Sequence, residues 1–319
     1  MAEGTGPEAV TLREGRAARV ATRTSPFGAE LSVRPYAVAD ELAVLDLVAA
    51  DRLPGQPAVT AAMLAEALAG RSPVDGGWWA ELEPPVTDVV HDAAGTLLGV
   101  VSRAVRPRDG AGFVLWLHCR EAPSVAEALL AHVLRRLGER VVYAFAFASA
   151  LTLGLEGLPA VHRRATRDAL LDAGFTGRDR WRYMRRPLPA GPLPATGLPG
   201  AAHVAITAAR SEDPPGNRLE VREDGELLAE ATVGSTVEGT GVLWWIGAAP
   251  PARVRGLGLA MLGAALDLLT EVGAHEVILY VDDDAPSGDA ERDRTAANGM
   301  YDRAGFTEID RLHSFTRQA

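Results

Sequence analysis

The sequence predicts an α/β protein with two tandem domains, each built on a mixed β-sheet. Both halves of the chain show the same order of elements: a hairpin, a strand, a helix, a strand, a helix and a last strand. Asp172-Ala173-Gly174-Phe175 and Arg303-Ala304-Gly305-Phe306 mark the same point in each half, just before the last strand. A proline-rich run at 187–194 lies between the halves and is typical of an extended linker. We interpret the repeated order as an internal duplication.

The first half contains a tail and a complete domain. Residues 1–28 are polar, small and interrupted by glycine and proline, so we expect a disordered tail. The N-terminal domain is predicted over residues 29–186, with Asp40, Thr60 and Ser124 as helix N-caps. Apolar periodicity and turn residues predict its elements. These are a strand at 31–35, helices at 41–48 and 60–69, a hairpin at 86–103, a strand at 113–117, a helix at 124–137, a strand at 141–145, a helix at 164–171 and a strand at 181–184.

The second half repeats this pattern in a shorter form. A linker is predicted over 187–200 and the C-terminal domain over 201–319. Too little chain separates the linker from the next hairpin to hold the two opening helices of the first copy. We therefore expect the shortened copy to need the N-terminal one for an acceptor pocket. Its elements are a hairpin of 219–222 and 227–231, a strand at 242–246, a helix at 256–272, a strand at 276–281, a helix at 295–303 and a strand near 313–315.

The composition excludes several classes of protein. No run approaches the roughly 18–20 apolar residues of a membrane span, and no basic segment followed by an apolar core opens the chain. The single cysteine, Cys119, excludes an intramolecular disulfide and a cysteine-rich zinc site. We therefore expect a cytoplasmic protein without a metal centre. The net charge of −10 argues against a nucleic-acid partner. All 32 basic residues are arginine, which excludes lysine chemistry.

The segment 250–262 joins a strand to a helix and carries the clearest chemical signal. Gly256 and Gly258 let the backbone approach a ligand closely. The first amides of the following helix have no partner within the helix and lie at the positive end of its dipole. Such a helix start binds pyrophosphate, and Arg253 and Arg255 can add charged contacts.

Arg253-x-x-Gly256-x-Gly258 resembles the cofactor loop of the GNAT (GCN5-related N-acetyltransferase) superfamily. The resemblance covers about residues 219–315 and implies an acyltransferase that binds acetyl-CoA. The last helix follows the family pattern at Ala297, Met300-Tyr301 and Gly305-Phe306. The implied cofactor contacts are Ile246, Gly247, Ala248, Arg253, Val254, Arg255, Gly256, Leu257, Gly258 and Leu259. The tandem layout is similar to that of the actinobacterial mycothiol synthases, which have two such domains.

The resemblance implies direct transfer of acetyl from the thioester to an amine, with an acid and a base. Tyr301 stands at the position of the acid; the alternative is that it only packs on Phe306. The base position departs from the family, because Val242 stands where many members have glutamate. Glu238, upstream, and Asp282, at the end of the next strand, are the candidate bases. The run 282–284 is otherwise typical of a solvated loop, and deprotonation relayed by water stays open.

The equivalent junction in the first half, residues 117–126, has lost these features. It contains no glycine, and Glu121 would repel a phosphate. Leu170 stands at the position of the tyrosine. We therefore predict a degenerate domain that binds no coenzyme A. His118 and Cys119 are neighbours on a strand, so their side chains point to opposite faces and cannot form a base–nucleophile pair.

Taken together, these features predict an N-acetyltransferase for the amine of a small molecule, acting as a monomer or homodimer without a membrane or nucleic-acid partner. Retention of Tyr301 favours an enzyme. Loss of the glutamate at Val242 favours an alternative, a protein that binds acetyl-CoA as a sensor or scaffold without turnover. An enzyme that uses a longer acyl group is also open.

Overall fold

The computed structural model describes residues 23–24, 30–189, 191, 193, 205–212, 214–249, 252, 255–282 and 294–319. The predicted tail at 1–28 lies outside this part of the chain apart from Arg23–Thr24, which pair with the following strand. The predicted linker is described only at residues 187–189, 191 and 193. Arg253 and Val254 of the predicted cofactor loop also lie outside the described residues.

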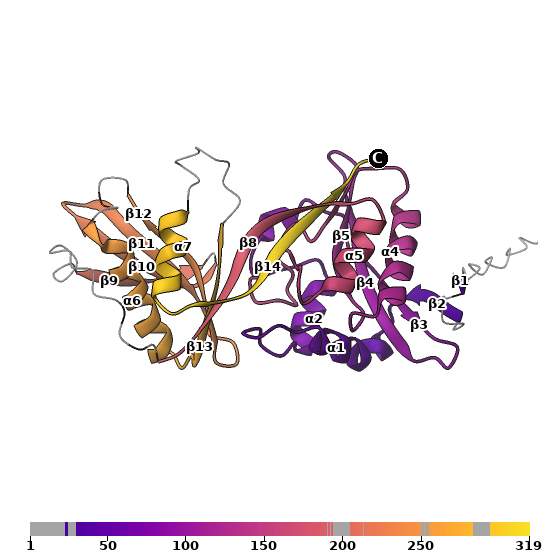
Figure 1. Ribbon diagram of the computed structural model, residues 1–319, viewed down its shortest axis with the longest axis horizontal. Helices are drawn as coiled ribbons and strands as arrows, with labels where there is room; N and C mark the ends of the chain where they lie inside the picture. Colours follow the sequence, from indigo (N-terminus) through magenta and orange to yellow (C-terminus); the bar gives the residue numbers. More distant parts are fainter. Residues whose placement is uncertain are drawn as a thin grey trace, which may run out of the picture.

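The described strands form one continuous sheet that runs through both halves of the molecule (Figure 1). Their order is β1-β2-β3-β4-β5-β6-β14-β8-β13-β12-β11-β10-β9, with β7 beside β14. Most neighbours are antiparallel, and the pairs β5–β6 and β12–β13 are parallel. The strands are β1 Arg23–Thr24, β2 Glu30–Pro35, β3 Val86–His91, β4 Leu97–Arg106, β5 Ala111–His118, β6 Val142–Ala144, β7 Leu158–Pro159, β8 Thr176–Pro187, β9 Ile206–Glu212, β10 Pro215–Glu223, β11 Glu226–Gly234, β12 Thr240–Ala248, β13 Glu276–Asp282 and β14 Thr307–Arg317.

The last strand of each half belongs to the sheet of the other half. β8 ends the N-terminal half but pairs with β13, from Glu276 opposite Pro187 to Asp282 opposite Trp181. β14 ends the chain but pairs with β6, where Phe315 lies opposite Ala144. The two exchanged strands also pair with each other and cross between the two lobes (Figure 1). The domain boundary predicted at the linker therefore stays a proposal, since the two halves share these strands.

Helices cover the sheet in both halves. α4 and α5 pack on one face of the N-terminal strands, and α1 and α2 pack with a separate apolar cluster of that half. α6 and α7 pack on the C-terminal strands. No described helix precedes β10 in the C-terminal half, and none in the described part of the chain has the length and apolar character of a membrane span. The helices are η1 Val38–Asp40, α1 Glu41–Ala50, α2 Ala61–Leu68, α3 Gly76–Trp79, α4 Pro123–Leu137, α5 Arg164–Asp172, α6 Leu257–Glu271 and α7 Thr295–Arg303.

Of the three predicted N-caps, Asp40 and Thr60 are confirmed by position and Ser124 is wrong; the Asp40 side chain makes no capping hydrogen bond to α1. The Thr60 side chain accepts a hydrogen bond from the Met63 amide at 3.2 Å and caps α2. Ser124 lies inside α4, whose N-cap is Ala122. Pro123 takes the first helical position, because its fixed φ suits a helix start and it has no N–H to satisfy.

The N-terminal half covers the second face of the C-terminal sheet, where the described part of the shortened copy has no helix. Leu53 and Leu155 form one apolar cluster with Val242 of β12 and Ile278 of β13. Gly55 comes so close that an added Cβ would lie 2.5 Å from Ile278 Cγ2, and its φ of +80° also favours glycine. The two halves therefore meet directly over the parallel strands of the C-terminal half.

Candidate functional site

The parallel strands β12 and β13 form a wedge that opens toward the cofactor loop predicted from the sequence. Thr240–Val242 pair with Glu276–Ile278, and beyond this point the described strands are no longer hydrogen-bonded to each other. β11 pairs with β12 on its other edge as far as Ala248. Main-chain groups of β12 therefore border the wedge, where an extended ligand can bind as an added strand would.

α6 begins where this wedge opens. Gly256 is its N-cap and has a φ of +75°, a left-handed conformation that side chains with a Cβ rarely adopt. Gly256 has no side chain that could cap the helix, so the first amides of α6 can point toward an anionic ligand. α7 packs beside this turn, since an added Cβ at Gly258 would lie 3.6 Å from Met300 Sδ. The predicted loop residues Leu257 and Gly258 are thus in the first turn of a helix that starts at the wedge.

Other predicted cofactor residues surround this turn. Ile246, Gly247 and Ala248 form the end of β12, and Leu259 lies in the first turn of α6. Arg255 donates hydrogen bonds to the carboxylate of Glu223, the last residue of β10, at 2.9 and 3.2 Å. A phosphate would have to compete with Glu223 for this guanidinium.

Tyr301 lies in α7 and is 5% exposed. Its ring packs edge-to-face on Phe306, with the ring centroids 5.6 Å apart. A tyrosine phenol is protonated at neutral pH, and burial raises the pKa of Tyr301 further above its ordinary value. Asn298, one turn earlier in α7, donates a hydrogen bond to the carbonyl of Asp282 at 3.1 Å and ties α7 to the end of β13.

The two predicted bases lie at opposite ends of the wedge strands. Asp282 is the last residue of β13, beside α7. Glu238 is exposed in the turn before β12, with a φ of +48°. It precedes the paired segment, whereas the wedge opens after Val242. The structure therefore brings Asp282 and α7 together but leaves Glu238 behind the closed end of the wedge.

The paired tryptophans in β12 differ in their surroundings. Trp245 is 51% exposed, whereas Trp244 packs in the cluster between the two halves. Its ring lies edge-to-face against Tyr280 of β13 at 6.4 Å. Trp244 is therefore the member of the pair that lines the face of the wedge covered by the N-terminal half.

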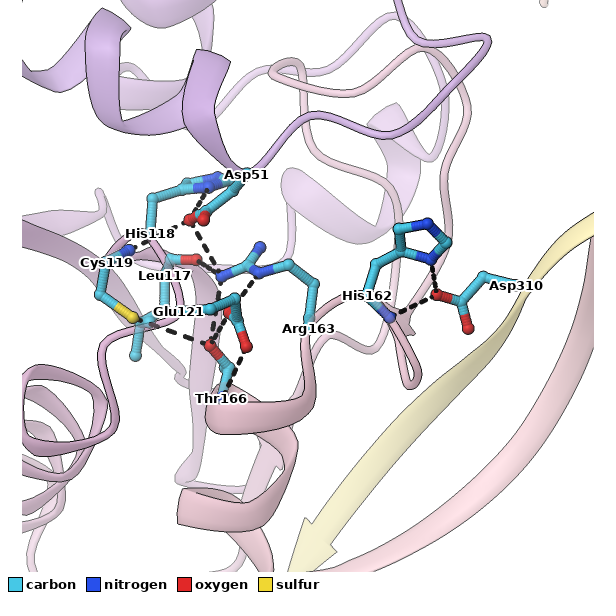
Figure 2. Close-up of polar contacts among 9 residues, drawn as sticks. All are labelled: Asp51, Leu117, His118, Cys119, Glu121, His162, Arg163, Thr166 and Asp310. Atoms are coloured by element: carbon cyan, nitrogen blue, oxygen red, sulfur yellow. Dashed lines mark hydrogen bonds and ion pairs between the residues drawn. The ribbon is translucent and has the colours of Figure 1, made fainter.

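The equivalent junction in the N-terminal half is closed by its own side chains (Figure 2). β5 and β6 also pair only over Gly112–Val114 and Val142–Ala144. Glu121, in the loop before α4, accepts hydrogen bonds from Arg163 Nε at 2.6 Å and from Thr166 Oγ1 at 2.7 Å. Its carboxylate also accepts the Thr166 amide at 3.1 Å, at the start of α5. The Glu121 carboxylate thus occupies this junction, and it would repel a second anion such as a phosphate.

Neighbouring groups complete this closed network. Arg163 lies 3.3 Å from Asp51, whose carboxylate is 3.2 Å from His118 Nδ1 (Figure 2). Burial lowers the pKa of His118. Burial also raises the pKa of the Cys119 thiol to about 11, so this cysteine is not a thiolate at neutral pH. Leu170, at the tyrosine position, is fully buried.

Sequence reasoning missed one acidic group near the wedge. Glu156 belongs to the N-terminal half but its carboxylate accepts a hydrogen bond from Tyr280 Oη in β13 at 3.0 Å. No motif surrounds Glu156, and no strand or helix contains it. Two glycines flank its loop at 154 and 157, both with positive φ, and they are the only local sign of a special backbone.

Comparison with known proteins agrees with these features. Residues 198–306 match the model of the acetyltransferase (GNAT) family. The mycothiol acetyltransferase of Beutenbergia cavernae is 35% identical over 86 residues, which are 27% of this chain and 26% of that protein. The mycothiol acetyltransferase of Pseudarthrobacter chlorophenolicus is 34% identical over 120 residues, 35% of this chain and 34% of that protein. The chain therefore matches about a third or less of the length of these curated relatives.

Solved structures share the fold over most of the chain. A GCN5-related N-acetyltransferase from Sphaerobacter thermophilus has a TM-score of 0.58 and 17% identity, over 90% of this chain and 95% of that one. A tandem GNAT protein from the clavulanic acid biosynthesis pathway has a TM-score of 0.60 and 16% identity, over 90% and 98%. The expected fold class, a mixed α/β sheet in a tandem GNAT arrangement, is confirmed. Residues 198–306 of this chain are thus similar to the acetyltransferase (GNAT) family.

Proposed function

We propose that this chain is an N-acetyltransferase that binds acetyl-CoA in its C-terminal half and transfers the acetyl group to the amine of a small molecule. The contrast between the two equivalent junctions carries the proposal. In the C-terminal half, β12 leads to Gly256 and an uncapped helix start. In the N-terminal half, β5 leads to Glu121, whose carboxylate already binds Arg163 and Thr166.

The residues at the C-terminal junction fit a pyrophosphate and an extended thioester arm. The first amides of α6, from Leu257 on, would hold the pyrophosphate, and Gly256 provides the left-handed turn into the helix. The wedge beyond Val242 and Ile278 would hold the arm between β12 and β13, where the two strands no longer pair with each other. Bound acetyl-CoA supplies an activated acetyl group as a thioester.

Tyr301 is the proposed acid. The phenol is protonated at neutral pH, and contact with Phe306 fixes the ring. A protonated phenol beside the loop can donate to the thiolate that leaves when the acetyl group is transferred. Asp282, which the sequence also suggested as a base, lies beside α7. Its main-chain carbonyl accepts the hydrogen bond from the Asn298 side chain.

One observation favours the alternative of an acetyl-CoA sensor without turnover. Val242, at the position where the family often has glutamate, is fully buried and apolar. Among the described residues, the C-terminal half therefore places valine and not a carboxylate at the point where β12 and β13 part. Turnover then depends on a base from elsewhere, whereas a sensor needs none.

Calorimetric titration with acetyl-CoA tests the proposal. Gly256→Glu places a bulky anion at the helix start and should abolish binding. Gly273→Glu is the matched control, because Gly273 is exposed, has a φ of +88° and follows the other end of the same helix. Both substitutions carry a similar left-handed strain of about 1–2 kcal/mol. Loss of binding in the first variant alone supports the site; equal affinities in both variants and the unaltered chain contradict it.

A further inference from the structure

The loop that carries Glu156 reaches from the N-terminal half to the open end of the C-terminal wedge. Tyr280 lies two residues beyond Ile278, the last residue of β13 that pairs with β12. Tyr280 Oη donates to Glu156 Oε1 at 3.0 Å. The carboxylate is therefore held where the two strands have just parted, on the face opposite α6 and α7.

The position of this loop is fixed by packing. Gly154 lies against Trp244 so closely that an added Cβ would be 2.2 Å from the indole ring. The amide of Leu153, the preceding residue, donates to Gln56 Oε1 at 2.9 Å. Gln56 in turn donates to Tyr183 Oη of β8 at 3.1 Å. Direct contacts with Trp244 and Gln56, and through Gln56 with Tyr183, thus hold the loop of Glu156 in place, as a group that acts on a substrate must be held.

Glu156 borders open space on its other side. It lines a cavity of about 440 Å³ together with Asp75, Trp78, Phe147 and Arg180. This volume is within the range of about 300–1,000 Å³ that is typical of small-molecule sites. The cavity lies in the N-terminal half, and Glu156 is the group that joins it to the C-terminal strands through Tyr280.

We propose that Glu156 is the general base of the C-terminal active site and that the acceptor amine enters through this cavity. The inference rests on the proposed acetyltransferase function. The acceptor ammonium gives a proton to Glu156, and its nitrogen then attacks the thioester carbonyl. The C–N bond forms as the C–S bond breaks. The nitrogen loses its second proton to solvent, and the leaving thiolate takes a proton from Tyr301.

The electrostatics of the loop suit this role. Burial raises the pKa of Glu156 to about 7, and the charges of Asp75 and Asp282 act in the same direction. The hydrogen bond from Tyr280 and the charge of Arg180 oppose the increase. A base with a pKa near the working pH combines a useful fraction of free carboxylate with a strong tendency to accept a proton.

The first test compares Glu156→Gln with Glu238→Gln. The rate of thiol release from acetyl-CoA is measured with phenethylamine as the acceptor probe, and acetyl-CoA affinity is measured by calorimetry. We expect Glu156→Gln to lose about 10²-fold or more in rate and to keep its acetyl-CoA affinity. Glu238→Gln should behave like the unaltered chain. An unchanged rate and pH profile in Glu156→Gln would overturn the inference while leaving acetyl-CoA binding intact.

A second test needs no acceptor. Carbodiimide with glycine ethyl ester modifies protonated carboxyl groups, and mass spectrometry locates the product. At pH 6.5 we expect labelling of Glu156, which should decrease as the pH is raised through its pKa of about 7. If phenethylamine is not turned over, absence of label at Glu156 overturns the inference and its presence supports it. A chain that binds no acetyl-CoA would refute the proposed function, and the inference with it.

Discussion

Glu156 and Tyr280 meet across the junction of the two halves, with the phenol donating to the carboxylate at 3.0 Å. About 120 residues separate them along the chain, and the exchanged strands β8 and β14 bring their halves together. The contact explains how a shortened C-terminal half with valine at position 242 can still have a carboxylate at its wedge. The same contact makes the N-terminal half part of the proposed active site.

The position of Glu156 should cost stability at alkaline pH. Its folded pKa of about 7 lies above the ordinary value of 4.5, so the folded chain binds more protons between these two pH values. The free energy of unfolding therefore falls as the pH rises through this window. Glu156→Gln should be more stable than the unaltered chain at pH 8, by up to about 3 kcal/mol, and equal at pH 4. Thermal melts at both pH values measure this; equal melting temperatures at pH 8 would argue against a raised pKa.

Substitutions of two neighbours of Glu156 should shift the acid limb of the pH–rate profile in opposite directions. Tyr280→Phe removes the hydrogen bond that lowers the pKa of Glu156, so the limb should shift to higher pH. Asp75→Asn removes a charge that raises this pKa, so the limb should shift to lower pH. Rates with phenethylamine from pH 5 to 9 measure both. Both variants are measured with the same acceptor, so the ionisation of phenethylamine cancels from the comparison. Shifts of the acid limb in the same direction would contradict the assignment of Glu156 as the base.

Tyr301→Phe separates an enzyme from a sensor. The ring and its contact with Phe306 remain, and only the buried hydroxyl is lost. We expect a rate decrease of about 10²-fold with acetyl-CoA affinity unchanged, because the proton donor acts only after binding. Tyr36→Phe in the N-terminal half is the control and should keep its rate. A Tyr301→Phe variant with full activity would leave the hydroxyl with a packing role alone.

Asp310 should stabilise the packing of β14 against the N-terminal half, and its loss should lower the free energy of unfolding. This buried carboxylate of β14 accepts the amides of Val161 and His162 at 3.0 and 2.8 Å, and His162 Nδ1 lies 2.7 Å from it (Figure 2). Asp310→Ala leaves these groups without a partner and should cost about 2–4 kcal/mol. Glu308→Ala removes a more exposed carboxylate of the same strand and should cost less than about 1 kcal/mol. Urea unfolding compares them, and similar costs would contradict this role for Asp310.

The sequence was sufficient for the elements with strong local patterns. The helix predicted at 256–272 is α6, Leu257–Glu271, and the helix predicted at 295–303 is α7. Apolar spacing and the glycine at its start set α6, and neither depends on distant contacts. The strand predicted at 181–184 is also present, within the longer β8.

The partners of these strands could not be predicted in the same way. Alternation of side chains identifies β8 and β14 as strands but does not say which sheet they join. The exchange is set by tertiary packing, such as Tyr183 donating to the Pro54 carbonyl at 2.9 Å. Glu156 was missed for the same reason, because its place beside Tyr280 depends on that exchange and on no local motif.

The stoichiometry of acetyl-CoA binding tests the central claim most directly, namely that only the C-terminal junction is open. Calorimetry with the unaltered chain should give one equivalent per chain, because Glu121 and Arg163 close the N-terminal junction. Two equivalents would contradict that closure. No binding at all would contradict the C-terminal site and, with it, the proposed acetyltransferase function.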